Sequence, residues 1–107
     1  MIPAETFRQR VYAIVAQIPR GKVASYGLVA LFAGRPGAAR AVGTAMREVP
    51  SRWRGQKLPC HRVIKSDGSL TEAVFGGRQK KILMAEGAKF GRTGRVNMKI
   101  CEWEGPD

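Results

Sequence analysis

The chain has 107 residues and a mass of 11.7 kDa, with an ordinary apolar fraction of 44%. This length supports a single domain over residues 1–107, with its own core, but not two domains. No apolar run approaches the roughly 20 residues of a membrane span, and no charged leader precedes an apolar block at the start. We therefore expect a cytoplasmic protein, or a nuclear one if the source has a nucleus.

The charge of the chain points to a polyanionic partner. Nineteen Lys and Arg residues against eight Asp and Glu give a net charge of +11. Between Arg35 and Lys65 there are eight basic residues and a single acid, Glu48. Such a field favours nucleic acid or an anionic membrane surface, and its clustering in a small domain favours nucleic acid. The alternative is a merely solubilising basic surface.

The first half of the chain has the outline of a helix-turn-helix. Residues 4–18 are predicted to form an amphipathic helix, and 22–27 an extended segment in which Ser25 caps the next helix. A short helix stopped at Gly34 and a second helix over 38–48 follow, joined by a tight turn.

The second of these helices carries unusually little side-chain bulk. Arg40 is the one long cationic side chain among its small residues, which are Ala38, Ala39, Ala41, Gly43 and Ala45. Small residues allow a helix backbone to approach another surface closely, and that surface is either an external partner or the protein's own core. Both interpretations stay open on composition.

The second half of the chain is predicted to alternate loops with short elements. Residues 49–58 form a basic loop whose Trp53 either stacks on a base or anchors the loop in the core. Residues 61–70 suggest a short strand, a turn and an extended piece, and 78–86 a helix. The alternation of Val96, Met98 and Ile100 predicts a hairpin over 89–103, with Cys101 a buried or edge thiol.

One short stretch carries candidate chemistry. "PCHRV" (59–63) places the nucleophile Cys60 beside the chain's only histidine, His61. A thiol reacts as its thiolate, which a neighbouring histidine can help to form. Side chains of neighbouring residues on a strand point to opposite faces, so a water or a turn after Pro59 would have to connect the two. Glu86 is a candidate to orient His61. Two cysteines and one histidine lack the paired spacing of a zinc site, so we expect no metal.

Three ordered motifs identify a resemblance. "IPRGKVASYGLVA" (18–30), "GRPGAARAVGTAMR" (34–47) and "PCHRV" (59–63) together resemble the DNA-binding and active-site domain of the O6-alkylguanine-DNA alkyltransferases. The resemblance implies a mainly α fold with short β segments, a winged-helix-like domain whose helix-turn-helix (about 26–48) enters the minor groove. It also implies flipping of a damaged guanine, and irreversible alkyl transfer without a cofactor.

The resemblance assigns roles to individual residues. Cys60 matches the alkyl acceptor, His61 the residue that relays its proton through water, and Glu86 the acid that orients the histidine; Arg62 matches a structural anchor. Arg40 matches the finger that fills the stack after flipping. The implied DNA-binding residues are Tyr26, Arg40, Ala38, Ala39 and Gly43. The implied substrate pocket comprises Tyr26, Val63, Phe75, Gly76 and Met46.

The chain also departs from that family. Glu48-Val49-Pro50 replaces the Asn-Pro segment that follows "AMR", the loop over 49–58 is longer, and Val74–Gly77 replaces a Tyr-x-Gly-Gly stretch. The carboxy-terminal part is more similar to the single-domain alkyltransferase-like proteins, which bind the lesion and hand it to nucleotide excision repair.

A basic helix-turn-helix domain with these residues allows three functions. The first is single-turnover alkyl transfer to Cys60, and the second is a lesion sensor that recruits nucleotide excision repair proteins. The third, a sequence-specific regulator, would need polar base-reading side chains where this chain has alanines. Both of the first two predict a nucleoid-associated or nuclear monomer bound to duplex DNA that contains O6-alkylguanine.

Overall fold

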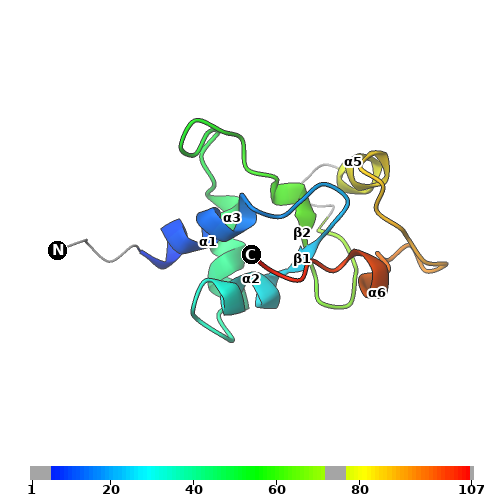
Figure 1. Cartoon of the computed structure of the whole chain (residues 1–107), viewed down its shortest axis with the longest axis horizontal. Coiled ribbons are helices and arrows are strands. Elements are labelled where there is room, and N and C mark those ends of the chain that lie inside the picture. The colour runs from blue at the N-terminus through cyan, green and yellow to red at the C-terminus, as the bar shows by residue number, and fades with distance from the viewer. Residues whose placement is uncertain (1–5, 72–76, 107) are drawn as a thin grey trace.

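The computed structural model describes residues 6–71 and 77–106 (Figure 1). Its elements, in chain order, are α1 (Phe7–Val15), β1 (Ala24–Ser25), α2 (Tyr26–Phe32), α3 (Ala39–Arg47), the 3₁₀ turn η1 (Cys60–Arg62), β2 (Val63–Ile64), α5 (Gln79–Ala85) and α6 (Met98–Cys101). The fold is mainly helical with short strands, as the sequence predicted.

Helix α1 is shorter than the predicted 4–18. It begins after Thr6, whose hydroxyl accepts a hydrogen bond from the Gln9 amide at 3.2 Å. The last turn tightens before Pro19, because the amides of Gln17 and Ile18 bond three residues back, at 3.0 and 3.1 Å. The α-helical pattern therefore ends at Val15, and residues 4 and 5 lie outside the described chain.

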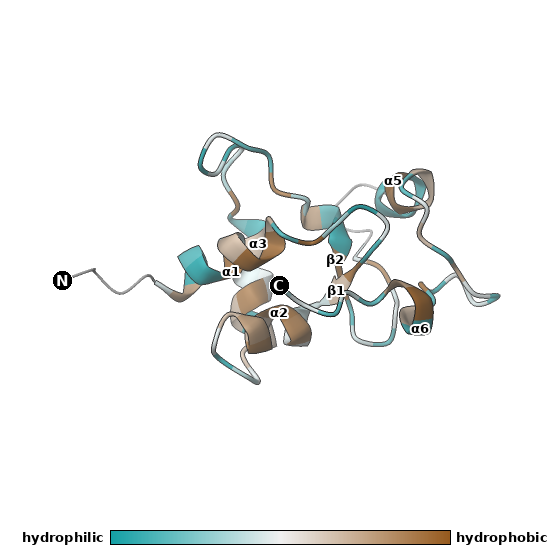
Figure 2. Ribbon diagram, in the orientation of Figure 1, coloured by the Kyte–Doolittle hydropathy of each residue, from teal (hydrophilic) through white to brown (hydrophobic). Residues whose placement is uncertain are grey.

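The helix-turn-helix is formed by α2 and α3. Ser25 caps α2 as predicted, with its hydroxyl accepting from the Leu28 amide at 3.1 Å. Gly34 adopts a φ of +89°, in the left-handed region where glycine is least strained, and so lets the chain leave the helix. Helix α3 packs on α1 and α2 through Val42, Ala45 and Met46, whose spacing places them on one helical face. Figure 2 shows mostly apolar colouring along α2, and apolar residues mixed with hydrophilic ones along α3.

The two strands connect the helix-turn-helix to the PCHR turn. They pair in parallel, with Ala24 opposite Val63 and Ser25 opposite Ile64. The carboxy-terminal segment joins the same layer, since the Val23 amide donates to the Cys101 carbonyl at 2.9 Å and Val23 accepts from the Trp103 amide at 2.8 Å. This arrangement fixes η1, which directly precedes β2, against the start of α2.

The predicted hairpin over 89–103 is only partly right. Phe90 and Val96 form an antiparallel bridge around a tight tip. Beyond it the chain turns into α6, because the Asn97 side chain caps the new helix by accepting from the Lys99 amide at 3.1 Å. The strand predicted from the alternation of Val96, Met98 and Ile100 is therefore wrong, and Ile100 is 55% exposed.

The strand predicted within 61–70 is limited to Val63–Ile64, because His61 belongs to the preceding 3₁₀ turn. Over residues 6–71 and 77–106, no helix has the length and apolar character to cross a membrane. In the same residues, no three or more His, Cys, Asp or Glu side chains gather in a way that could hold a metal ion.

Candidate active site and DNA-binding surface

The residues of the PCHR motif form a tight turn that points their side chains in different directions. The Arg62 amide bonds the Pro59 carbonyl at 3.0 Å, which closes η1 over Cys60–Arg62. A 3₁₀ helix has three residues per turn, so successive side chains point about 120° apart. Cys60 and His61 therefore diverge, and a proton moving between them needs an intervening water.

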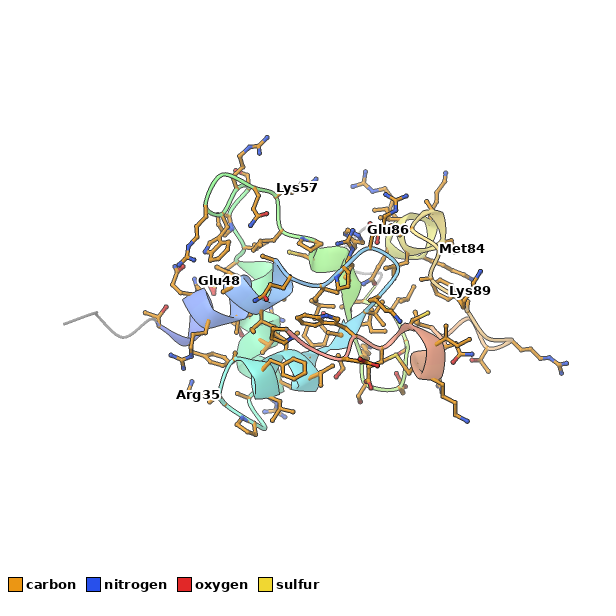
Figure 3. The ribbon with its side chains drawn as sticks, viewed as in Figure 1. Arg35, Glu48, Lys57, Met84, Glu86 and Lys89 are labelled. Atoms are coloured by element: carbon orange, nitrogen blue, oxygen red, sulfur yellow. The ribbon has the colours of Figure 1, made fainter. Side chains whose placement is uncertain are left out.

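A carboxylate at the end of α5 joins the other two motif residues. Glu86 accepts from Arg62 through both oxygens, at 2.9 and 2.8 Å, and bonds His61 Nε2 at 2.9 Å. Arg62 also donates to the Ile18 carbonyl at 2.8 Å, which ties the group to the chain after α1. Glu86 lies at the end of α5, as labelled in Figure 3. The structure thus brings together three side chains that are up to 25 residues apart.

The contacts in this cluster keep the Glu86 carboxyl group ionised. The Arg62 bond, opposed by burial and helped by His61, lowers the pKa of Glu86 from 4.5 to about 2, so its carboxylate is ionised at neutral pH. An ionised carboxylate can only accept a hydrogen bond, so Nε2–H donates to it, and Nδ1 is the ring nitrogen left for another partner. His61 is thereby oriented and able to take a proton.

The thiol of Cys60 is not activated in the free protein. Burial raises its pKa above the ordinary value, against smaller opposing effects of a backbone hydrogen bond and the Lys57 charge. The thiol is therefore protonated at neutral pH, and any reaction as a nucleophile needs a base at the moment of attack.

Cys60 lies between two cavities. The first, here called the α3 cavity, has a volume of about 510 Å³, and its lining comprises Tyr26, Ala39, Arg40, Gly43, Thr44, Met46, Arg47, Cys60, Lys65 and Thr71. The second, of about 440 Å³, lies between the loop after α3 and α5, and Cys60 and His61 both line it. Cys60 therefore borders both the helix-turn-helix side and the side that His61 lines.

Two residues that sequence reasoning missed connect the site. Gln79 is fully buried; its amide donates to the carbonyls of His61 (2.9 Å) and Val63 (3.3 Å), and its oxygen accepts from the Thr71 amide at 2.7 Å. The Thr71 hydroxyl in turn bonds the Tyr26 hydroxyl at 2.9 Å. Gln79 thus links the PCHR turn to the cavity wall. Nothing in the polar stretch around it signals burial, which only the fold creates.

Packing inside the protein does not account for the glycine on the outward face of α3. A Cβ placed on Gly43 would meet only Arg47 Nη1, at 3.7 Å, which is ordinary van der Waals contact. Internal packing therefore does not require glycine there, although a glycine inside a helix costs about 0.5–1 kcal/mol relative to alanine. Ala45, by contrast, packs in the core. The outward small residues leave room for an external surface to approach the helix, with Arg40 exposed among them.

Comparison with known protein families shows which family the chain belongs to. The sequence model of the family "6-O-methylguanine DNA methyltransferase, DNA binding domain" matches residues 6–88. The chain belongs to this family.

Proteins similar to this chain include base-flipping proteins, methyltransferases and an alkyltransferase-like protein. A "DNA base-flipping protein" of Vibrio parahaemolyticus is 39% identical over 94% of this chain and 98% of its own length. The rat "Methylated-DNA--protein-cysteine methyltransferase" is 40% identical over 79% of this chain, which spans only 40% of that protein. A solved structure of Schizosaccharomyces pombe Atl1, "in complex with damaged DNA containing O6-carboxymethylguanine", aligns with a TM-score of 0.75 at 34% identity, over 92% of this chain and 94% of that one.

Apart from His61, Arg62 and Glu86, which form the cluster described above, the residues that the methyltransferase resemblance selected fall into three groups. Those that line the α3 cavity are Tyr26, Ala39, Arg40, Gly43, Met46 and Cys60. Ala38 is the first residue before α3 and packs partly against the core, and the Val63 side chain is wholly buried in the core because β2 pairs with β1. Phe75 and Gly76, with Val74, lie outside the described residues.

Two departures from the methyltransferase motif have clear structural places. Glu48, which stands where the motif has asparagine, pairs with Arg8 of α1 at 2.6 Å on the surface. Trp53 of the long loop is buried; its ring meets Tyr12 edge-on and its Nε1 donates to Gln9 at 2.9 Å. Of the two interpretations of Trp53, the core anchor is the one the structure adopts.

Proposed function

We propose that the protein binds O6-alkylguanine in duplex DNA, flips the damaged nucleotide into the α3 cavity and transfers its alkyl group irreversibly to Cys60. One observation carries the proposal: Cys60 lies in the lining of the same cavity as Tyr26 and the small face of α3. Flipping a base costs a few kcal/mol, and a poorly paired damaged base costs least. The names of the Vibrio, rat and fission-yeast proteins support the same partner.

The side chains of the site can supply and accept the protons that the proposed transfer requires. Cys60 Sγ loses its proton through water to His61, whose ring is held by Glu86. Sγ then forms a bond to the alkyl carbon as the bond from that carbon to O6 breaks. The guanine leaves as the normal base once the proton held by His61 returns through water to its N1, so neither a cofactor nor an oxidant is needed. The thioether on Cys60 is permanent, which makes the protein act once.

We further propose that residues 1–107 form one alkyltransferase-type DNA-binding domain, with its active-site motif at 59–63, acting as a monomer on DNA in the nucleoid or nucleus. The net charge of +11 supports a DNA partner, since Lys and Arg residues that neutralise phosphates supply most non-specific affinity.

A lesion sensor is the second candidate function. Its specific support is the pKa of Cys60, which burial raises and which therefore keeps the thiol protonated in the free protein. In this case the protein would hold the flipped base without reaction and recruit nucleotide excision repair proteins.

Intact-protein mass separates the two functions. The protein is incubated with a duplex that contains one O6-methylguanine, beside a Cys60→Ser control. A gain of one methyl group by the wild type alone supports transfer to Cys60. Unchanged mass with selective retention of the damaged duplex makes the protein a sensor, and unchanged mass with equal binding of damaged and undamaged duplex overturns both functions.

A further inference from the structure

The basic loop after α3 ends in a hairpin whose turn is built from an unusual residue. Trp53 and Gln56 exchange both backbone hydrogen bonds, at 2.8 and 3.0 Å. The two residues between them, Arg54 and Gly55, have φ of +49° and +81°. This is the two-residue turn that favours Asn-Gly, because both central residues are left-handed. Among the described residues, Arg54 is the one non-glycine with positive φ, a conformation that costs about 1 kcal/mol or more.

The hairpin is held rigidly against the core. Trp53 is fixed by Tyr12 and Gln9, and the Arg54 guanidinium stacks over its ring at 4.3 Å from the centroid. Arg52 donates back to the Gly55 carbonyl at 3.3 Å. Stacking offsets part of the strain at Arg54. A cationic plane is therefore presented at a defined position on an exposed turn.

The charge of this loop is of one sign and adjoins the active site. Residues 49–58 contain three cations, Arg52, Arg54 and Lys57, and no acid. The loop follows Arg47, which lines the α3 cavity, and Lys57 lines the neighbouring cavity at Cys60. In Figures 1 and 3 the loop projects beyond α1 and α3, and Lys57 lies on it.

We propose that the hairpin loop, residues 51–57, is a second DNA-contacting surface that binds backbone phosphates of the duplex beside the flipped nucleotide. Guanidinium groups match phosphate oxygens through paired hydrogen bonds, and pre-ordering reduces the entropy lost on contact. A strained arginine where asparagine would relax the turn indicates that its charge is used. Continuity with the cations of the α3 cavity favours DNA over an acidic protein as the partner.

The proposal is tested by the salt dependence of binding to an undamaged duplex of about 20 base pairs, from about 50 to 200 mM salt. The loop variant Arg52→Gln/Arg54→Asn/Lys57→Gln should reduce the slope of log K against log salt by about 2–3, since each phosphate contact contributes about 0.9. Arg54→Asn alone should reduce it by about 1 while leaving the melting temperature equal or higher, because asparagine suits the turn.

A matched variant controls for net charge. Lys89→Gln/Arg92→Gln/Lys99→Gln removes three exposed cations near the other end of the long axis, where Figure 3 labels Lys89. Its slope should stay close to that of the wild type. An unchanged slope in the loop variant, or an equal reduction in both variants, overturns the proposal; the first result would leave an acidic protein as the partner. The undamaged duplex makes the outcome independent of whether Cys60 accepts an alkyl group.

Discussion

Glu86→Gln is expected to lower the free energy of unfolding at neutral pH by about 3 kcal/mol. The pKa of Glu86 falls from 4.5 to about 2 in the folded protein, chiefly through Arg62 and next through His61. This lowering of the pKa by between two and three pH units corresponds to about 3 kcal/mol, at about 1.4 kcal/mol per pH unit. The side chain is only 9% exposed, so solvent screens these contacts weakly.

The pH dependence has a definite sign. The folded-state pKa lies below that of the unfolded chain, so the stabilisation is complete above about pH 5 and disappears as the pH falls toward 2. Urea unfolding from about pH 7 to about pH 2.5 should therefore show the wild-type and Glu86→Gln curves converging in acid. A control, Asp67→Asn, removes an exposed carboxylate whose pKa is lowered by its hydrogen bonds from Ser69, and should change stability far less. A Glu86→Gln deficit that stays constant with pH would refute the reasoning, because it would reflect packing and not charge.

The remaining predictions concern the helix face, the nucleophile and the buried amide. Gly43→Ala should stabilise the fold by about 0.5–1 kcal/mol in urea unfolding, yet weaken duplex binding in a mobility-shift assay; Gly27→Ala in α2, where a Cβ would meet nothing within 4 Å, should give the stability gain alone. Stronger binding by the first variant would show that DNA does not approach α3 closely. Alkylation of Cys60 by iodoacetamide, followed by peptide mass, should stay slow at neutral pH and accelerate only above the ordinary thiol pKa, while buried Cys101 stays unmodified; fast labelling at neutral pH would contradict a protonated thiol. Gln79→Leu should remove the bonds of one buried amide to three backbone groups and destabilise the protein by about 2–4 kcal/mol in urea unfolding; a loss below about 0.5 kcal/mol would mean that water replaces its bonds.

Local signals in the sequence were sufficient for elements that depend on their own residues. Ser25 could be assigned as a cap because a hydroxyl before a helix satisfies free amides wherever it occurs. The small outward residues of α3 could be found because a helix repeats every 3.6 residues. Asn97 shows the limit: it caps a four-residue helix that the alternation of Val96, Met98 and Ile100 disguised as a strand. Short elements offer too few periods to decide between the two.

The sequence by itself determined the candidate chemistry: an acceptor thiol at Cys60, a histidine beside it and a basic chain for a polyanion. Only the tertiary structure decided how that chemistry is supported. The pairing of Glu86 with Arg62 and His61, and the burial of Gln79 beneath the cavity, join segments up to 25 residues apart. Burial also raises the pKa of the thiol. These properties depend on desolvation and on contacts between distant segments, which exist only once the chain has folded.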